Sequence, residues 1–262
     1  MSNRLTALFA KQKKNFLSVY YTAGFPHLED TLFIAREVQN AGADLIEIGI
    51  PFSDPVADGP VIQASNEKAL ENGMSLKLLF SQIEKLRETV TIPVLLMGYF
   101  NPVYQFGVEA FCKRCQEVGI DGLIIPDMPL WEYENQWKII LEQYGLFNIF
   151  LVTPQTSEER IRKIDELSSS FIYLVSSSSV TGAKTDVSES QVSYFNRIHS
   201  MQLKSPTLIG FGISSKETFD RACRYADGAI IGSAFINILE TIPPPSDSSR
   251  FEPIHRFVTS LK

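Results

Sequence analysis

Glu47 and Asp58 are the residues whose surroundings in the sequence best suit chemistry. Glu47 lies within an apolar run, residues 45–50, and Asp58 follows in a loop rich in Pro, Gly and Asp. A strand that is apolar on both faces is normally buried in a parallel sheet, where a charge is costly unless it has a task. Burial also raises the pKa of a glutamate toward neutrality, which suits proton transfer. The segment therefore predicts a desolvated acid/base on a strand and a second carboxylate on a mobile loop.

The elements that must position these carboxylates are short apolar strands alternating with amphipathic helices. Helical periodicity is clear over residues 28–39, 76–87, 108–118 and 158–167, and a last helix is expected from about 251 to 261. Eight strands alternating with helices predict an α/β fold, a (β/α)8 TIM barrel, with residues 1–262 as a single domain. A doubly wound open sheet is the alternative, but no predicted strand is followed by a G-x-G-x-x-G turn. The predicted strands are residues 17–22, 45–49, 94–98, 122–126, 149–152, 172–175, 207–210 and 229–231.

An aspartate recurs directly before three of these strands, as Asp44, Asp121 and Asp227. Each follows a helix end and a turn, so it lies at the N-terminal end of a strand. That end is the stability face of a barrel, whereas active sites lie at the C-terminal ends. We therefore expect turn and capping chemistry from these aspartates and no catalytic role.

Two Gly-rich strand ends, residues 210–214 and 231–234, come late in the chain. Glycine lets backbone N–H groups approach an anion closely, and a helix N-terminus adds a favourable dipole. The ends of strands seven and eight are a recurrent phosphate site in barrels, so phosphate binding is predicted here. The alternative is two tight turns with Ser214 and Ser233 as helix caps. A Ser-rich stretch, residues 176–190, could be a lid over the barrel mouth or an ordinary linker.

Composition excludes several classes of function. The net charge of −6, without a dense Lys/Arg cluster, argues against nucleic acid or an anionic membrane as main partner. No apolar run approaches the roughly 18 to 20 residues of a membrane span. Three cysteines do not suggest a disulfide framework, which favours a reducing, cytoplasmic location. The Cys112-x-x-Cys115 pair is expected to be helix packing rather than a metal or redox site, and no metal is predicted.

These segments together resemble the alpha subunit of tryptophan synthase. The resemblance covers essentially the whole chain in order, and the run Pro-Phe-Ser-Asp-Pro-x-Ala-Asp-Gly-Pro is highly specific. It implies a carbon–carbon lyase of tryptophan biosynthesis that cleaves indole-3-glycerol phosphate to indole and glyceraldehyde 3-phosphate by a retro-aldol step. The segments that carry it are residues 20–24, 47–60, 96–102, 173, 180–182, 210–214 and 232–233.

The resemblance also implies roles for individual residues. Glu47 would protonate indole C3 and take the proton from the glycerol hydroxyl, and Asp58 would hold the indole N–H. Tyr173 would line the indole pocket. Thr181 would belong to the lid and touch Asp58 on closure, and Asp127 would support Glu47 from behind. The residues implied to bind the substrate phosphate are Gly182, Phe211, Gly212, Gly232 and Ser233.

The resemblance implies a partner as well. The family works with a beta subunit that carries pyridoxal phosphate and receives the indole, in a hetero-tetramer of two alpha and two beta subunits. No metal or organic cofactor is implied for this chain. Residues 51–60 and 101–102 resemble the elements that contact and signal to the partner.

One departure from the family motivates one alternative function, and a second alternative is open independently of it. Ser179 and Ser177 stand where the family usually has a Gly and, two positions upstream, a basic residue. A Ser in a conformation that suits Gly costs about 1 kcal/mol, so a catalytically weak scaffold that activates the beta subunit is one alternative. Another phosphate-binding barrel, an isomerase or epimerase, is the second. A metal-dependent epimerase should carry His ligands at strand ends, but the histidines are expected in loops or helices.

Overall fold

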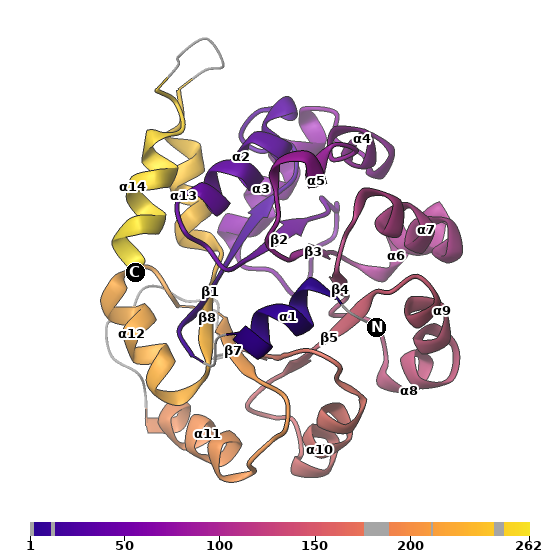
Figure 1. The fold of residues 1–262 in the computed structure, drawn as a ribbon, viewed down its shortest axis with the longest axis vertical. Coiled ribbons are helices and arrows are strands. Elements are labelled where there is room, and N and C mark those ends of the chain that lie inside the picture. The colour runs from indigo at the N-terminus through magenta and orange to yellow at the C-terminus, as the bar shows by residue number, and fades with distance from the viewer. Residues whose placement is uncertain (1–2, 12–13, 176–188, 211, 244–248) are drawn as a thin grey trace.

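Eight parallel strands form a closed barrel, hydrogen-bonded in the order β1 to β8 (Figure 1). The computed structural model describes residues 3–11, 14–175, 189–210, 212–243 and 249–262. The predicted (β/α)8 barrel is confirmed, and each predicted strand is present with its ends shifted by at most two residues. The strands are β1 Phe16–Thr22, β2 Leu45–Gly49, β3 Val94–Met97, β4 Gly122–Ile124, β5 Phe147–Val152, β6 Ile172–Val175, β7 Thr207–Gly210 and β8 Gly228–Ile231.

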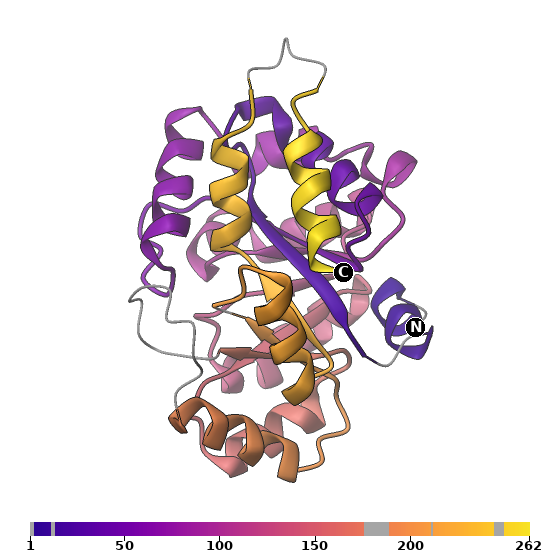
Figure 2. The same ribbon diagram turned by 90° about the vertical axis from the view of Figure 1, so that its left-hand side faces the viewer.

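Helices surround the barrel as an outer layer (Figures 1 and 2). The single helix predicted over residues 76–87 is wrong in one respect, because the backbone leaves helical dihedrals at Ile83 and resumes after Lys85. Ile83 and Leu86, on either side of the break, are both fully buried. The main helices are α1 Arg4–Lys11, α2 Thr31–Asn40, α3 Pro60–Glu71, α4 Leu76–Gln82, α5 Leu86–Thr89, α6 Phe100–Phe106, α7 Val108–Val118, α9 Lys138–Gln143, α10 Glu158–Leu167, α11 Glu189–Ser200, α12 Lys216–Tyr225, α13 Ser233–Glu240 and α14 Glu252–Leu261.

Shorter helical turns complete the layer. They are a 3₁₀ turn, η1 Leu28–Asp30, a short α8 Leu130–Glu132 and a π-helical turn, η2 Tyr133–Trp137. Cys112 and Cys115 are buried on α7, as the packing prediction required. Across the described ranges, each helix is too short or too polar to span a membrane.

Side chains fill the barrel interior in an apolar cluster separate from the larger core between sheet and helices. Because side chains alternate along a strand, Leu45 and Glu47 on β2 point to the same face. Leu45 belongs to the interior cluster, together with residues from β3 to β8. Glu47 is therefore a carboxyl inside the barrel.

The three recurrent aspartates bind backbone at the N-terminal ends of the strands. Each accepts a hydrogen bond from an N–H of the strand that neighbours its own, and its backbone N–H donates to the carbonyl of the same residue. The predicted capping role is thus confirmed. The pairs are Asp44 with Leu17 at 2.9 Å, Asp121 with Val94 at 2.9 Å and Asp227 with Thr207 at 2.8 Å.

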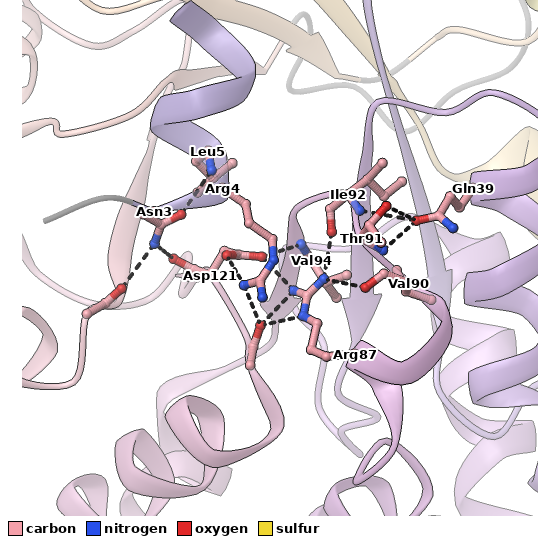
Figure 3. Close-up of polar contacts among 12 residues, drawn as sticks. Asn3, Arg4, Leu5, Gln39, Arg87, Val90, Thr91, Ile92, Val94 and Asp121 are labelled. Atoms are coloured by element: carbon pink, nitrogen blue, oxygen red, sulfur yellow. Dashed lines mark hydrogen bonds and ion pairs between the residues drawn. The ribbon is translucent and has the colours of Figure 1, made fainter.

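Helix α1 lies across this N-terminal end of the barrel (Figure 1). Its Leu5 is fully buried in the interior cluster. Figure 3 shows the polar contacts that anchor it: Asn3 donates to the carbonyl of Asp121 at 2.8 Å, and Arg4 and Arg87 both pair with the Asp121 carboxylate. Since α1 occupies this end, the opposite, C-terminal ends of the strands are left for a site.

Candidate active site

Glu47 is a fully buried carboxyl in which, within the described part of the chain, one oxygen accepts a hydrogen bond and the other does not. The Ser18 hydroxyl, from β1, donates to Oε1 at 2.7 Å. Oε2 is buried and has no hydrogen-bond partner among the residues that the structure describes. Burial raises the pKa of Glu47 to about 7, and the Ser18 hydrogen bond lowers the pKa in part. The group therefore exchanges its proton readily near neutral pH.

Asp58 lies half-buried in the loop between β2 and α3 and is held by Tyr99. The Tyr99 hydroxyl donates to Asp58 Oδ2 at 3.1 Å and accepts from the N–H of Ala57 at 2.9 Å. Burial raises the pKa of Asp58 to about 6, against the lowering effect of the Tyr99 hydrogen bond. Tyr99 was not predicted as a site residue. Its position directly after the third predicted strand was the available signal.

Two tyrosines share the surroundings of these carboxylates. Burial raises the pKa of Tyr173 on β6 well above its usual value, and the charges of Glu47 and Asp58 raise that pKa further. The pKa of Tyr20 on β1 is likewise raised, first by burial and then by Asp58. All four groups thus belong to one site, which supports the predicted place of Tyr173. Sequence reasoning assigned no role to Tyr20.

Glycines make room for both tyrosine rings. A Cβ at Gly49 would lie 2.2 Å from the Tyr20 hydroxyl oxygen, and one at Gly210 would lie 2.1 Å from that of Tyr173. Both distances are impossible contacts. Gly49 and Gly210 end their strands, so their missing side chains let the tyrosines reach the C-terminal mouth of the barrel.

The two Gly-rich turns lie at the ends of β7 and β8, as predicted. Gly212 has φ +77°, a conformation that favours glycine. Gly232 precedes α13, so the first N–H groups of that helix, beginning at Ser233, have no partner within the helix. The N-cap of α12 is Ser215, which forms a capping box with Thr218, and the N-cap of α13 is Gly232. Ser214 and Ser233 are therefore not caps, because both helices start one residue away from the predicted position.

Four predicted site residues need separate comment. Thr181, Gly182 and Phe211 lie outside the described residues. Asp127 is exposed and accepts a hydrogen bond from the N–H of Phe100 at 2.9 Å. No hydrogen bond joins Asp127 to Glu47 among the described residues. The predicted role of Asp127 in supporting Glu47 therefore stays a prediction. The described residues also include no group of three or more His, Cys, Asp or Glu that could hold a metal ion.

A closed (β/α)8 barrel with a buried carboxyl of near-neutral pKa, a second carboxyl on the loop after β2, and Gly-rich turns after β7 and β8 is typical of one class: barrel enzymes of acid–base chemistry on phosphate-bearing substrates. Comparisons with known proteins narrow this class. Residues 5–253 match the sequence profile of the family described as "Tryptophan synthase alpha chain". The chain belongs to the tryptophan synthase alpha chain family.

Relatives and solved structures agree with that assignment. The tryptophan synthase alpha chain of Flavobacterium johnsoniae is 57% identical over 237 residues, which are 90% of this chain and 93% of the relative. That of Bacteroides thetaiotaomicron is 51% identical over 243 residues, 93% of this chain and 95% of the relative. The crystal structure of tryptophan synthase subunit alpha from Legionella pneumophila superimposes with a TM-score of 0.87 at 32% identity, covering 100% and 97% of the two chains.

Proposed function

We propose that this chain catalyses the retro-aldol cleavage of indole-3-glycerol phosphate to indole and glyceraldehyde 3-phosphate, as the alpha subunit of a tryptophan synthase. The observation that carries this proposal is the buried Glu47 carboxyl with an unoccupied Oε2 and a pKa near 7. Cleavage of the bond to indole C3 needs one group that both gives and takes a proton. A carboxyl poised near neutrality does both.

The two carboxyls divide the proton chemistry between them. Protonated Glu47 gives its proton to indole C3, and ionised Asp58 accepts a hydrogen bond from the indole N–H and stabilises the positive charge on the ring. Glu47, now ionised, removes the proton of the glycerol hydroxyl next to the scissile bond. The electron pair of the O–H bond forms the aldehyde, the C–C bond breaks, and its electron pair returns to the indole ring. Glu47 ends the cycle protonated, as it began.

The remaining residues hold the substrate. Tyr173 lines the indole pocket, and the turns at Gly212, Gly232 and Ser233 bind the phosphate through backbone N–H groups. The family resemblance assigns Gly182 and Phe211 to the phosphate site and Thr181 to a lid, and all three lie outside the described residues. For Asp127 the bond to the Phe100 N–H supports a different function, that of fixing the start of α6.

The partner in this proposal is a beta subunit, in a hetero-tetramer of two alpha and two beta chains in the cytoplasm. The pyridoxal phosphate belongs to the partner, and two carboxyls suffice for the chemistry of this chain without a cofactor of its own. A solved relative, the tryptophan synthase of M. tuberculosis, was captured in an aminoacrylate-bound form; its matched chain is 27% identical, with a TM-score of 0.84.

Exposed apolar side chains support the position of the partner surface. Val56, Tyr104 and Trp131 are 86%, 63% and 64% exposed. They follow β2, β3 and β4, so they lie on the side of the barrel that bears the site. Exposed apolar side chains that gather on one face are typical of surfaces that become covered, whereas single ones are ordinary. The surface includes residues 51–60 and 101–102, the segments that the resemblance assigns to the partner.

The experiment that tests this function is indole release from indole-3-glycerol phosphate by the purified chain, with and without a tryptophan synthase beta chain. Release that increases with the partner is the expected result. No release in either condition, with activation of the beta chain intact, would identify the scaffold alternative instead. Turnover of a different sugar phosphate would identify the isomerase alternative.

A bell-shaped pH profile is expected for kcat/KM. Asp58 must be ionised, so activity rises as the pH increases through about 6, and Glu47 must start protonated, so activity falls as the pH increases through about 7. The two pKa values lie so close together that the maximum between the two limbs is narrow. The phosphate of the substrate also titrates in this range. Glycerol phosphate carries the same group, so the pH dependence of its inhibition constant measures that contribution and allows it to be subtracted. A rate that continues to rise above pH 8 would show that Glu47 starts the reaction ionised.

Gly232→Ala is expected to raise KM about tenfold without loss of folding. The added Cβ would lie 3.6 Å or more from its neighbours, so the free protein accommodates it. The methyl group would instead occupy space that the phosphate needs for close contact with the backbone. Steady-state kinetics together with a melting curve check this. An unchanged KM would remove Gly232 from the phosphate site.

A further inference from the structure

We propose that Ser18 is a positioning residue for Glu47, whose hydroxyl fixes Oε1 so that Oε2 is the oxygen that exchanges protons with the substrate. The inference rests on the proposed function, because it assigns a task to a neighbour of the acid/base of that reaction. The hydrogen bond from Ser18 should also affect the titration of the Glu47 carboxyl, which can be measured without substrate.

The register of the barrel brings Ser18 to Glu47. Tyr20 of β1 is the Cα partner of Glu47 of β2, and Ser18 lies two residues earlier on the same face of β1. Both Ser18 and Glu47 are fully buried. A hydroxyl at this point reaches the carboxyl from the side of the barrel that is closed by α1. Oε2, the other carboxyl oxygen, is buried and has no hydrogen-bond partner among the described residues, so it is the oxygen available to a substrate.

The hydrogen bond determines the orientation of the carboxyl. A serine hydroxyl carries one proton, and here it donates to Oε1 at 2.7 Å, the usual length of an O–H···O hydrogen bond. The terminal torsion of glutamate is otherwise soft and roughly two-fold. With Oε1 held, rotation that would exchange the two oxygens breaks the bond. Ser18 therefore reduces the carboxyl to one productive orientation.

The other groups that face Glu47 do not replace Ser18. Tyr20 and Tyr173 feel the charge of Glu47, but neither hydrogen-bonds to it among the described residues, and Tyr20 instead lies 3.4 Å from the Thr22 hydroxyl. Both tyrosines remain neutral at working pH, because burial raises the pKa of each. Asp58 is the remaining charged group of the site, and its described side-chain hydrogen bond is with Tyr99.

The bond also matters for the energy of proton transfer. When Glu47 gives its proton to indole C3, it becomes an anion inside an apolar barrel, which is costly. A hydrogen bond to an ionised acceptor is stronger than one to a neutral acceptor. Ser18 therefore stabilises the ionised form of Glu47, which the first transfer produces. Its removal should make Glu47 a weaker acid as well as a less well oriented one.

Ser18→Ala tests the proposal through the pH profile. The alkaline limb of kcat/KM, which reports loss of the Glu47 proton, is expected to move to higher pH by about one unit, because the ionised form of Glu47 loses more from removal of the hydrogen bond than the protonated form does. At neutral pH kcat should fall about tenfold with little change in KM. Ser18→Thr retains a hydroxyl and should return the limb toward its original position.

Ser170→Ala is the matched control. Ser170 is also a buried serine, 8% exposed, and its hydroxyl has no hydrogen-bond partner among the described residues. Removal of this hydroxyl should leave the pH profile unchanged. Should Ser18→Ala fail to fold, Ser18→Cys keeps nearly the same volume with a weaker donor and should shift the limb in the same direction.

Infrared titration separates failure of this proposal from failure of the proposed function. The carbonyl band of protonated Glu47, identified by its loss in Glu47→Gln, should titrate about one unit higher in Ser18→Ala than in the unsubstituted chain, with no substrate present. An unshifted band would overturn the role of Ser18 even in an active enzyme. A shifted band in a chain that releases no indole would retain the role and reject the proposed reaction. A uniform loss of activity with an unmoved limb would show that Ser18 only packs.

Discussion

Glu47→Gln is expected to lower kcat for indole release by about 10⁴-fold, the upper end of what general acid–base catalysis supplies. One residue performs both proton transfers in the proposed mechanism, so its loss removes both. Glutamine has the shape of glutamate but cannot give or take the proton. The measurement is single-turnover indole release at pH values on both sides of the profile maximum.

The fold should tolerate this substitution. The amide oxygen of glutamine can accept the Ser18 hydrogen bond in place of Oε1. The amide NH₂ would then occupy the position of Oε2, which is already without a partner among the described residues. An unsatisfied buried donor costs about 1 to 3 kcal/mol, and part of this is offset because no ionisable group is buried any longer. A lowered but cooperative melting transition is therefore expected.

Two controls test whether the loss of rate comes from proton transfer alone. Binding of glycerol phosphate should be unchanged in Glu47→Gln, because the turns at Gly212 and Gly232 are separate from the carboxyl. Activation of the beta chain should also persist. If Glu47→Gln and the unsubstituted chain release indole at the same rate, the acid/base assignment fails and the carboxyl needs another explanation.

The sequence predicted Glu47 because its signal is local. A carboxylate inside a run that is apolar on both faces is exceptional wherever the strand is placed. The same holds for the aspartates before the strands, since each carries its own turn and helix end. These signals do not depend on which distant segments of the chain contact one another in the fold.

Ser18 and Tyr99 could not be found in the same way. A serine in an apolar strand is unremarkable until the register of β1 against β2 places it beside Glu47. Tyr99 becomes part of the site only when the loop after β2 folds back onto the end of β3. Asp127 shows the converse, since the family resemblance implied support of Glu47 whereas the carboxylate accepts a hydrogen bond from the N–H of Phe100. Contacts between strands are not encoded in any one segment.

The break between α4 and α5 was also not predictable from the sequence. Periodicity over residues 76–87 is continuous, and nothing in it signals a stop. Residues three apart lie on one face of a continuous helix, so the burial of both Ile83 and Leu86 does not explain the break.

Asp58→Asn is the second substitution with a large expected effect, a loss of about 10²- to 10³-fold in kcat. Asparagine retains the size of the side chain and can still accept the Tyr99 hydrogen bond. It cannot supply the negative charge that stabilises the protonated indole ring. The loss should therefore appear in kcat more than in KM, and Asp58→Ala should be at least as damaging.

Tyr99→Phe is the matched control, because it leaves the Asp58 charge in place and removes only its hydrogen bond. That bond lowers the pKa of Asp58 against the raising effect of burial. In Tyr99→Phe the acid limb of kcat/KM should therefore move to higher pH, with a modest loss of rate at the maximum. A mild change in Asp58→Asn, equal to that in Tyr99→Phe, would mean that the loop carboxylate only holds the loop. A large loss in Asp58→Asn beside a shifted limb in Tyr99→Phe would separate charge from geometry, because only the first variant lacks the charge.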